Sequence, residues 1–158
     1  MKSAIVFIFL FVTGIVGSAP GGDFDKLKTL VGEWETTSAE GNGRVTYQLT
    51  SNGTALLETI ANGSETMVSI YHQDGETTLM THYCSIGNQP RMRAQKSSDG
   101  KSITFNFVDI ANLKDSKTGH MTHLVIKFVD ADNVIEEWTW TDQGKDNTSV
   151  FRLHRVKK

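Results

Sequence analysis

The feature that most constrains this fold is a series of ten short segments in which apolar and polar residues alternate. The segments are rich in Thr, Val, Ile and aromatic residues, as β-strands are. They cover residues 34–38, 44–51, 54–61, 65–72, 77–84, 91–97, 102–109, 120–129, 134–141 and 149–155. Asx-Gly pairs such as Asn62-Gly63 and Asp74-Gly75 separate several of them. Such pairs favour the positive φ angles of two-residue hairpin turns, so the sequence predicts an antiparallel meander.

A meander of ten strands predicts a closed barrel. Parallel strands need long crossover connections, and most connections here are short. A sheet of this size must curl, and closure removes its two exposed edges. We therefore expect an all-β fold, a ten-stranded antiparallel up-and-down barrel. The one long connection, residues 110–119, is expected to form a flap or a short helix. Residues 23–31 have apolar side chains at helical spacing and predict a short helix before the barrel.

The first residues have the layout of a secretory signal peptide. Lys2 precedes an apolar run from Ala4 to Val16, and small residues occupy positions 17–19. The run is about 13 residues long, whereas a helix needs about 20 to cross a bilayer. No stable membrane anchor is therefore expected. We predict a signal peptide at residues 1–19, one domain at residues 23–158, and a secreted or periplasmic location.

Charge and cysteine content exclude several classes of function. The net charge is −2 and the isoelectric point is near 6.2, which gives no basic field for nucleic acid. Cys84 is the only cysteine, so no internal disulfide can form and burial must supply the stability. We expect it to be buried and inert. His82 and Cys84 form the nearest approach to a metal pair, but zinc and copper sites need three or four converging ligands. No metal or other cofactor is expected.

The sequence Gly32-Glu33-Trp34 follows the expected helix and opens the first strand. This arrangement, with the ten-strand meander after it, resembles the calycin superfamily, which includes lipocalins and fatty-acid-binding proteins. The phrases THYC, GNQPRM, GHMTH and EEWTW are also similar to uncharacterised bacterial lipocalin-like domains. The resemblance implies a small hydrophobic or amphipathic molecule held inside the barrel. It does not imply haem, because Trp34 is followed by Glu-Thr-Thr-Ser and not by the glycine-rich continuation of the nitrobindins.

Alternation within residues 134–141 places an acid inside the expected barrel. Glu136 shares one face of the strand with Trp138 and Trp140, the heavier apolar face. A carboxyl group in such a place needs a partner or a raised pKa. We therefore expect Glu136 either to form a salt bridge with an arginine across the barrel or to serve as a general base.

The same reasoning assigns faces in residues 102–109 and 120–129. Asp109 ends one segment and His120 begins the next, and both are expected to face inward at the same rim of the barrel. Met121 is expected to face outward. Asp109 and His120 then either form part of a functional mouth, or only satisfy each other or cap the long connection.

The most polar stretch of the chain, residues 79–93, leaves two alternatives open. Arg91 and Arg93 project from one face of their strand, and Met92 projects from the other. If the Met92 face is inside, both arginines are solvated. If the arginines face inward, they form a fork able to hold a carboxylate or phosphate. His82, on the preceding strand, is a further polar candidate.

Three possibilities follow from these residues, and one of them is a stability or interaction domain whose core is filled by side chains. The leading prediction is a module that binds a small hydrophobic or amphipathic molecule, with aromatic side chains around it and a few polar anchors. The predicted ligand-binding residues are His82, Arg91, Arg93, Asp109, His120, Glu136, Trp138 and Trp140. The alternative is an enzyme, an isomerase, cyclase or hydrolase, with Glu136 or His82 as general base and an arginine stabilising negative charge.

Overall fold

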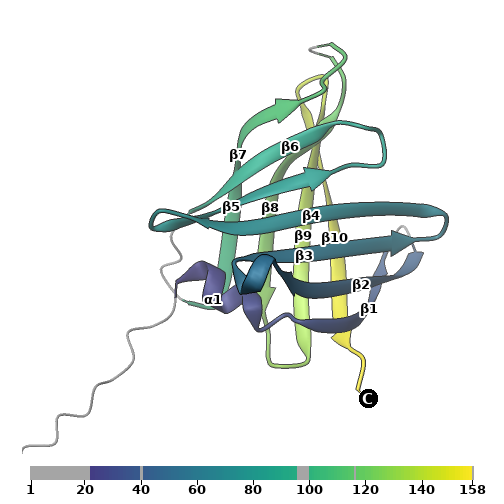
Figure 1. Ribbon diagram of the computed structural model, residues 1–158. Helices are drawn as coiled ribbons and strands as arrows, with labels where there is room; N and C mark the ends of the chain where they lie inside the picture. The colour runs from purple at the N-terminus through teal and green to yellow at the C-terminus, as the bar shows by residue number, and fades with distance from the viewer. Residues whose placement is uncertain (1–21, 40, 96–99, 116, 158) are drawn as a thin grey trace, which may run out of the picture.

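In the computed structural model the chain forms a closed antiparallel barrel of ten strands, with a short helix before the first strand (Figure 1). The structure describes residues 22–39, 41–95, 100–115 and 117–157. The elements are α1 (Asp23–Lys28), β1 (Gly32–Ser38), β2 (Gly41–Thr50), the 3₁₀ turn η1 (Ser51–Gly53), β3 (Ala55–Asn62), β4 (Glu65–Asp74), β5 (Thr77–Tyr83), β6 (Gln89–Gln95), β7 (Ser102–Ala111), β8 (His120–Phe128), β9 (Asn133–Asp142) and β10 (Lys145–Arg155). Each strand pairs with its neighbours in sequence, and β10 pairs with β1.

The expected all-β, up-and-down barrel is therefore confirmed. The strand bounds differ from the expected ones by a few residues, most at β10, which begins at Lys145. The end of the expected segment 91–97 and the expected signal peptide at 1–19 lie outside the described residues. The long connection before β8 forms neither helix nor strand in its described part, which omits residue 116. Within the described ranges, no helix has the length and apolar character needed to cross a membrane.

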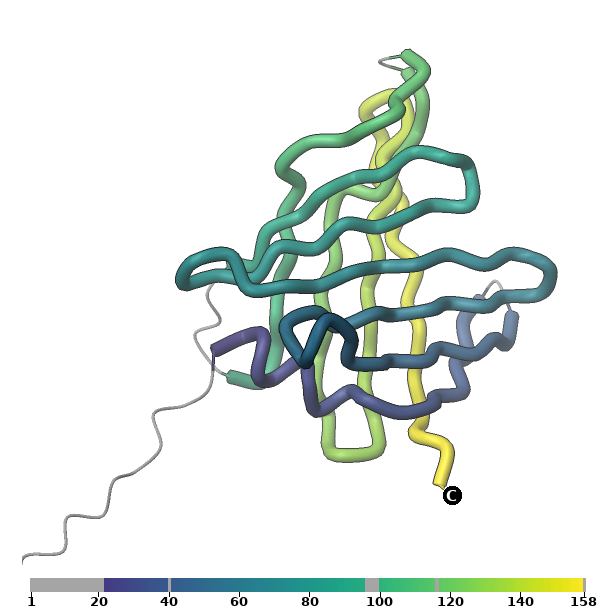
Figure 2. The backbone as a smooth tube through the Cα atoms, in the orientation of Figure 1, coloured from purple at the N-terminus to yellow at the C-terminus, as the bar shows by residue number. Residues whose placement is uncertain are grey.

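Helix α1 covers one end of the barrel. Its acidic residues lie in the first turn and its basic residues in the last, the arrangement that favours a helix electrostatically. Phe24 and Leu27 face the barrel and are buried, and Leu30 continues this apolar face after the helix. Figure 2 shows α1 and the turn between β8 and β9 at one end of the molecule, and the connection before β8 at the other. We call the end that α1 covers the closed end.

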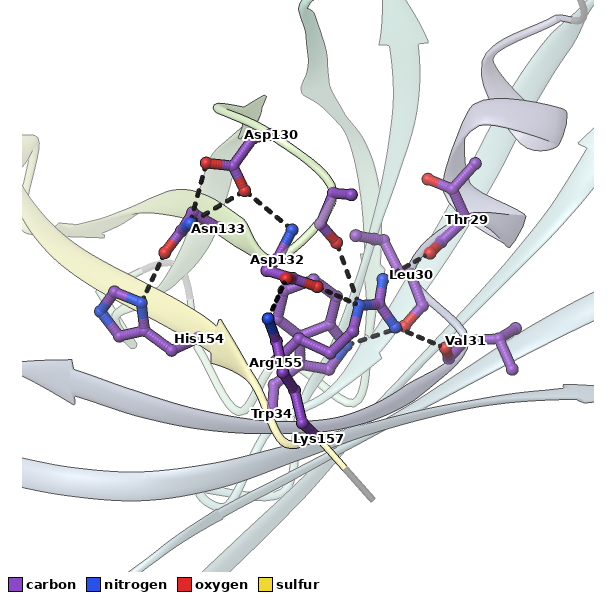
Figure 3. Close-up of polar contacts among 11 residues, drawn as sticks. Thr29, Leu30, Val31, Trp34, Asp130, Asp132, Asn133, His154, Arg155 and Lys157 are labelled. Carbon is purple, nitrogen blue, oxygen red and sulfur yellow. Dashed lines mark hydrogen bonds and ion pairs between the residues drawn. The ribbon is translucent and has the colours of Figure 1, made fainter.

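Arg155, at the end of β10, ties the segments of the closed end together (Figure 3). Its guanidinium group lies over the Trp34 ring, 4.1 Å from the ring centroid. It donates hydrogen bonds to the carbonyl oxygens of Thr29 (2.7 Å), Val31 (2.8 Å) and Ala131 (3.0 Å). One side chain therefore joins β10 to the connection between α1 and β1 and to the turn between β8 and β9.

The backbone at Gly32 shows why glycine starts β1. Its φ angle is +135°, and a Cβ atom there would lie 3.0 Å from Nη1 of Arg155. Only glycine adopts such a φ angle without strain, and any other residue would also require the guanidinium group to shift by a few tenths of an ångström. The first residue of the Gly32-Glu33-Trp34 sequence thus serves the packing of Arg155.

Two β-bulges change which side chains face the interior. Between β6 and β7 the register shifts, so that Arg91 pairs with Asp109 but Met92 pairs with Phe107. Between β8 and β9 a second shift falls between Met121 and His123. A bulge inserts one unpaired residue, and the alternation of faces is reversed beyond it.

Side chains from every strand fill the interior. Buried apolar residues come from α1 and from all ten strands, with Trp34, Tyr47, Tyr71 and Phe105 as the largest fully buried side chains. Their packing is dense at the closed end, where residues such as Leu30 and Leu153 are inaccessible to solvent. A cavity inside the barrel lies toward the other end.

Candidate functional site

A cavity of about 50 Å³ lies inside the barrel, on the side away from α1. The lining residues come from the ends of β1, β3 and β5, from the beginnings of β2, β4 and β8, and from β9 and β10. They are Thr36, Val45, Ile60, Asn62, Met67, His82, Met121, Glu136, Trp138 and Phe151. A cavity needs about 10–15 Å³ to hold one water molecule. This cavity therefore has room for a few waters or a small chemical group.

A row of polar side chains crosses the barrel wall beside this cavity. In the strand register, Tyr47 on β2 is opposite Glu58 on β3, Glu58 is opposite Ser69 on β4, and Ser69 is opposite His82 on β5. All four residues are buried. Directly opposed residues of antiparallel strands lie on the same face of the sheet, about 5 Å apart. The hairpin register therefore lines up four polar groups inside the barrel.

Hydrogen bonds join this row to Glu136 on β9. The Tyr47 hydroxyl lies 2.9 Å from Oε1 of Glu58 and also contacts Oε1 of Glu136. The Tyr71 hydroxyl donates to Oε2 of Glu58 at 2.8 Å, and Nε1 of Trp138 donates to Oε2 of Glu136 at 3.1 Å. Two carboxyl groups thus share a single tyrosine hydroxyl in the interior.

Counting protons shows that one of the two carboxyl groups is neutral. Tyr47 has one hydroxyl proton and can donate it to only one carboxyl group. The second contact is a hydrogen bond only if the other carboxyl group carries a proton and donates it to the tyrosine oxygen. Burial, followed by the two nearby carboxyl groups, raises the pKa of Tyr47, so this hydroxyl keeps its proton.

The hydrogen-bond partners indicate which acid is neutral. Burial raises the pKa of Glu58, and hydrogen bonds from Tyr71, Ser69 and Tyr47 offset only part of this rise. At Glu136, burial and then the negative charge of Glu58 raise the pKa to about 8. Glu136 is therefore the acid that holds the proton, and Glu58, to which both tyrosine hydroxyls donate, is the acid better placed to be ionised.

His82 is a neutral imidazole that faces the cavity. It is 1% exposed, and burial lowers its pKa to about 4. Its ring packs against Trp138 with centroids 4.8 Å apart, and its Nδ1 lies 3.0 Å from Oγ of Ser69. With the imidazole proton on Nδ1, His82 donates a hydrogen bond to the serine oxygen. Nε2 of His82 then presents a lone pair.

Two buried polar atoms on the cavity wall have no protein partner. They are Nε2 of His82 and Oγ1 of Thr36, and both residues line the cavity. A buried polar atom without a partner costs about 1–3 kcal/mol. A ligand or a bound water that contacts these atoms recovers that free energy.

Three of the predicted site residues meet around the cavity. His82, Glu136 and Trp138 line it, and Glu136 faces inward as expected. The expected salt bridge from Glu136 to an arginine is wrong, because its partners are Tyr47 and Trp138. Trp140 is half-buried on the same strand and is not among the lining residues.

The two arginines lie on the outer face of the barrel. Met92 is buried, so of the two alternatives for this strand the one with solvated arginines is found. Arg91 forms an ion pair with Asp109, with 2.6 Å between Nε and Oδ1, and Arg93 forms one with Asp74 at 2.6 Å. Neither arginine is placed to hold the polar end of a ligand in the cavity.

The bulges account for the other differences. Asp109 was expected inside but pairs with the outward-facing Arg91. His120 was also expected inside, but it is opposite Thr141 and its ring packs on Phe107 at 5.2 Å between centroids. Met121, expected outside, lines the cavity instead. Asp109 and His120 therefore do not satisfy each other, and ligand binding by either stays a prediction without support from this geometry.

Three functional residues were missed by the sequence analysis: Thr36, Tyr47 and Glu58. A signal was present for Glu58, because it alternates with Leu56 and Ile60 on one face of β3. Tyr47 alternates in the same way with Val45 on β2. Their contact with each other depends on the strand register, which alternation within one strand does not give.

Cys84 is half-buried, just past the end of β5, and does not line the cavity. In the part of the chain that the structure describes, no group of three or more His, Cys, Asp and Glu side chains is placed to hold a metal ion. Comparison with models of known protein families found no match, and neither did comparison with curated protein sequences.

Proposed function

We propose that this protein binds a small amphipathic molecule in the barrel, with the polar end of the molecule at His82, Glu136 and Thr36. The observation that carries the proposal is the pair of unpartnered polar atoms, Nε2 of His82 and Oγ1 of Thr36, on the wall of one cavity. Native interiors rarely leave such atoms without a partner. A bound polar group accounts for both of them at once.

The remaining cavity wall suits the apolar part of such a molecule. Val45, Ile60, Met67, Met121 and Phe151 line it, and all except Val45 are only partly buried. Methionine side chains adapt their shape to a ligand at low cost. The small size of the cavity favours a short or slender molecule over a bulky lipid.

Tryptophan fluorescence tests this proposal, because Trp138 lines the cavity. A panel of short-chain amines, alcohols, phenols and acids should contain compounds that change the emission saturably. Trp138→Phe should lose most of the change, and Trp140→Phe should keep it. The proposal is overturned if no compound of the panel gives a saturable change and calorimetry also detects no binding.

We further propose that the chain is an exported, distant member of the calycin superfamily. The support is the closed ten-stranded barrel, the short helix before it, and the Gly32-Glu33-Trp34 sequence at the start of β1. Support for export is the apolar run from Ala4 to Val16. Mass spectrometry of the mature protein tests export, with cleavage expected between Ser18 and Gly22.

A second candidate function is acid–base catalysis in the same cavity. The observation that favours it is a protonated carboxyl group, Glu136, and a neutral imidazole, His82, on one cavity wall. Such a pair can donate a proton to a small molecule and remove one from it. Turnover of a bound compound that is lost in both His82→Gln and Glu136→Gln would support this function. Unchanged product formation in either variant would exclude it.

A further inference from the structure

The charges inside the barrel do not balance. Among the described residues, the buried ionisable side chains outside the tyrosines are Glu58, His82 and Glu136, and none is a lysine or arginine. Both tyrosine hydroxyls donate to Glu58, so it is the acid placed to carry a negative charge, and no buried cation accompanies it. Hydrogen bonds from Tyr47 and Tyr71 spread this charge but do not cancel it. The interior therefore favours a positive group and disfavours a second negative one.

The polar groups on the cavity wall are mainly acceptors. With its proton on Nδ1, His82 presents a lone pair at Nε2, and Oγ1 of Thr36 has no partner. The oxygens of Glu136 contact Tyr47 and Trp138 and keep further lone-pair capacity. The indole N–H of Trp138 is already used by Glu136. These three side chains provide acceptor positions for a group that carries several N–H donors.

We propose that the ligand is a small primary amine with an apolar body, whose ammonium group donates hydrogen bonds to Thr36, His82 and Glu136. This inference rests on the proposed binding function and names the chemical class of its ligand. An ammonium group has three N–H donors, and the cavity wall offers three acceptors. Its charge offsets that of Glu58, and its contact with Glu136 favours the ionised form of that carboxyl group.

The same geometry disfavours other head groups. A carboxylate or phosphate would lie beside two acids, with Arg91 and Arg93 on the outer face of the barrel. A neutral alcohol can satisfy one or two of the acceptors but brings no charge. A quaternary ammonium brings the charge but has no N–H to donate. A primary amine supplies both the charge and the donors.

A matched series of four compounds tests the inference by calorimetry on the full mature chain. The compounds are pentylamine, pentanol, pentanoate and pentyltrimethylammonium, which share one apolar body. Pentylamine should bind at least about tenfold more tightly than pentanol, a difference of about 1.4 kcal/mol. Pentanoate should bind more weakly than pentanol, and pentyltrimethylammonium more weakly than pentylamine. The inference is overturned if pentanol or pentanoate equals pentylamine.

The series separates failure of this inference from failure of the proposed function. If pentylamine does not bind but another compound of the wider panel does, the binding function stands and the amine inference is wrong. If no compound binds, both are wrong.

Two variants and one control test the residues. Glu136→Gln keeps groups able to contact Tyr47 and Trp138 but removes the ionisable carboxyl group. Its affinity for pentylamine should be about tenfold lower than that of the wild type, and its affinity for pentanol should stay within about threefold of the wild-type value. Thr36→Val preserves shape and removes one acceptor, so pentylamine should again lose affinity. Glu137→Gln is the matched control, because Glu137 lies on the same strand but pairs with Lys127 on the outer face. Wild-type affinity in both Glu136→Gln and Thr36→Val, with circular dichroism showing a folded barrel, would contradict the inference.

Discussion

The polar groups around Trp34, at the closed end, and around Thr36, at the cavity end, differ in their partners. Trp34 and Thr36 lie two residues apart on β1 and face the same interior. At the closed end, Nε1 of Trp34 donates to the carbonyl oxygen of Leu30 at 2.8 Å, and Arg155 is bound by three carbonyl groups. At the cavity end, Oγ1 of Thr36 has no partner. Trp34 and Arg155 therefore find their partners within the protein, whereas the Thr36 hydroxyl is left to a ligand.

This difference teaches where stability and recognition reside. Hydrogen bonds that are complete within the protein hold segments together and gain nothing from a bound molecule. Polar atoms without partners lower the stability of the free protein and are the places where a ligand can gain affinity. Substitutions at the closed end should therefore change stability, and substitutions at the cavity should change binding.

The largest expected effect is at the closed end. Arg155→Ala removes three hydrogen bonds to carbonyl groups and the contact with the Trp34 ring. Bonds from charged donors contribute about 1.5–3 kcal/mol each but are not additive, so the free energy of unfolding should fall by about 3 kcal/mol. Urea unfolding measures it. Arg152 is exposed on the same strand, so Arg152→Ala should change the free energy of unfolding by less than about 0.5 kcal/mol. Equal losses in both variants would contradict the role given to Arg155.

A pH titration of stability tests the cavity end. The folded pKa of Glu136, about 8, lies above its ordinary value of 4.5, so its contribution to stability is lost as pH rises toward 8. The folded pKa of His82, about 4, lies below its ordinary 6.5, so stability rises with pH up to about 6.5. Below pH 6.5, Glu136 and His82 change the free energy of unfolding in opposite directions. Above pH 6.5, of these two groups only Glu136 still changes it. At 1.36 kcal/mol per pKa unit, the free energy of unfolding should fall by about 2 kcal/mol between pH 6.5 and 8.

Glu136→Gln isolates this effect. The variant should show an almost constant free energy of unfolding from pH 6.5 to 8, while Glu137→Gln should keep the wild-type fall. Chemical denaturation at several pH values measures both. A wild-type protein whose stability does not change in this interval would contradict the assignment of the proton to Glu136.

A smaller change in the free energy of unfolding is expected when the unpartnered hydroxyl group on β1 is removed. Thr36→Val replaces an unpartnered buried hydroxyl by a methyl group of similar shape. Removing such a group relieves part of its desolvation cost, so the free protein should gain about 1 kcal/mol of stability. Thermal unfolding without ligand measures it. A loss of stability would mean that the hydroxyl is already satisfied, by a bound water for example.

The smallest effect is expected on the outer face. Arg91→Gln breaks the ion pair with Asp109, in which both side chains are about half exposed to solvent. Exposed ion pairs contribute little to stability, and this one lies outside the cavity. The affinity for any cavity ligand should stay within about twofold of wild type. A clear loss of affinity in isothermal titration calorimetry would show that Arg91 contributes to ligand binding.

The sequence was sufficient to predict the barrel because alternation acts on every strand independently. Each of the ten segments shows it, and errors of a few residues at one strand, such as the later start expected for β10, do not change the topology. Glu136 was placed inside for the same reason, since β9 is regular around it. Information held within one strand was read correctly.

Features that depend on the pairing between strands were not predicted correctly. One extra residue at each bulge reversed the faces of Asp109, His120 and Met121, and no residue type marks a bulge in this sequence. The contact between Tyr47 and Glu58 depends on register, which the turn between β2 and β3 sets. The partner of Glu136 was therefore taken for an arginine, the common partner of an acid, when it is a tyrosine from β2.

The pairing of β10 with β1 and β9 has a consequence for how this chain is made. The eleven residues of β10 are the last strand to be synthesised, yet they fill the gap between the first strand and the ninth. Until they arrive, two edges are unpaired and open to pairing with other chains. A premature stop before Lys145 should therefore produce an aggregating fragment instead of a smaller barrel.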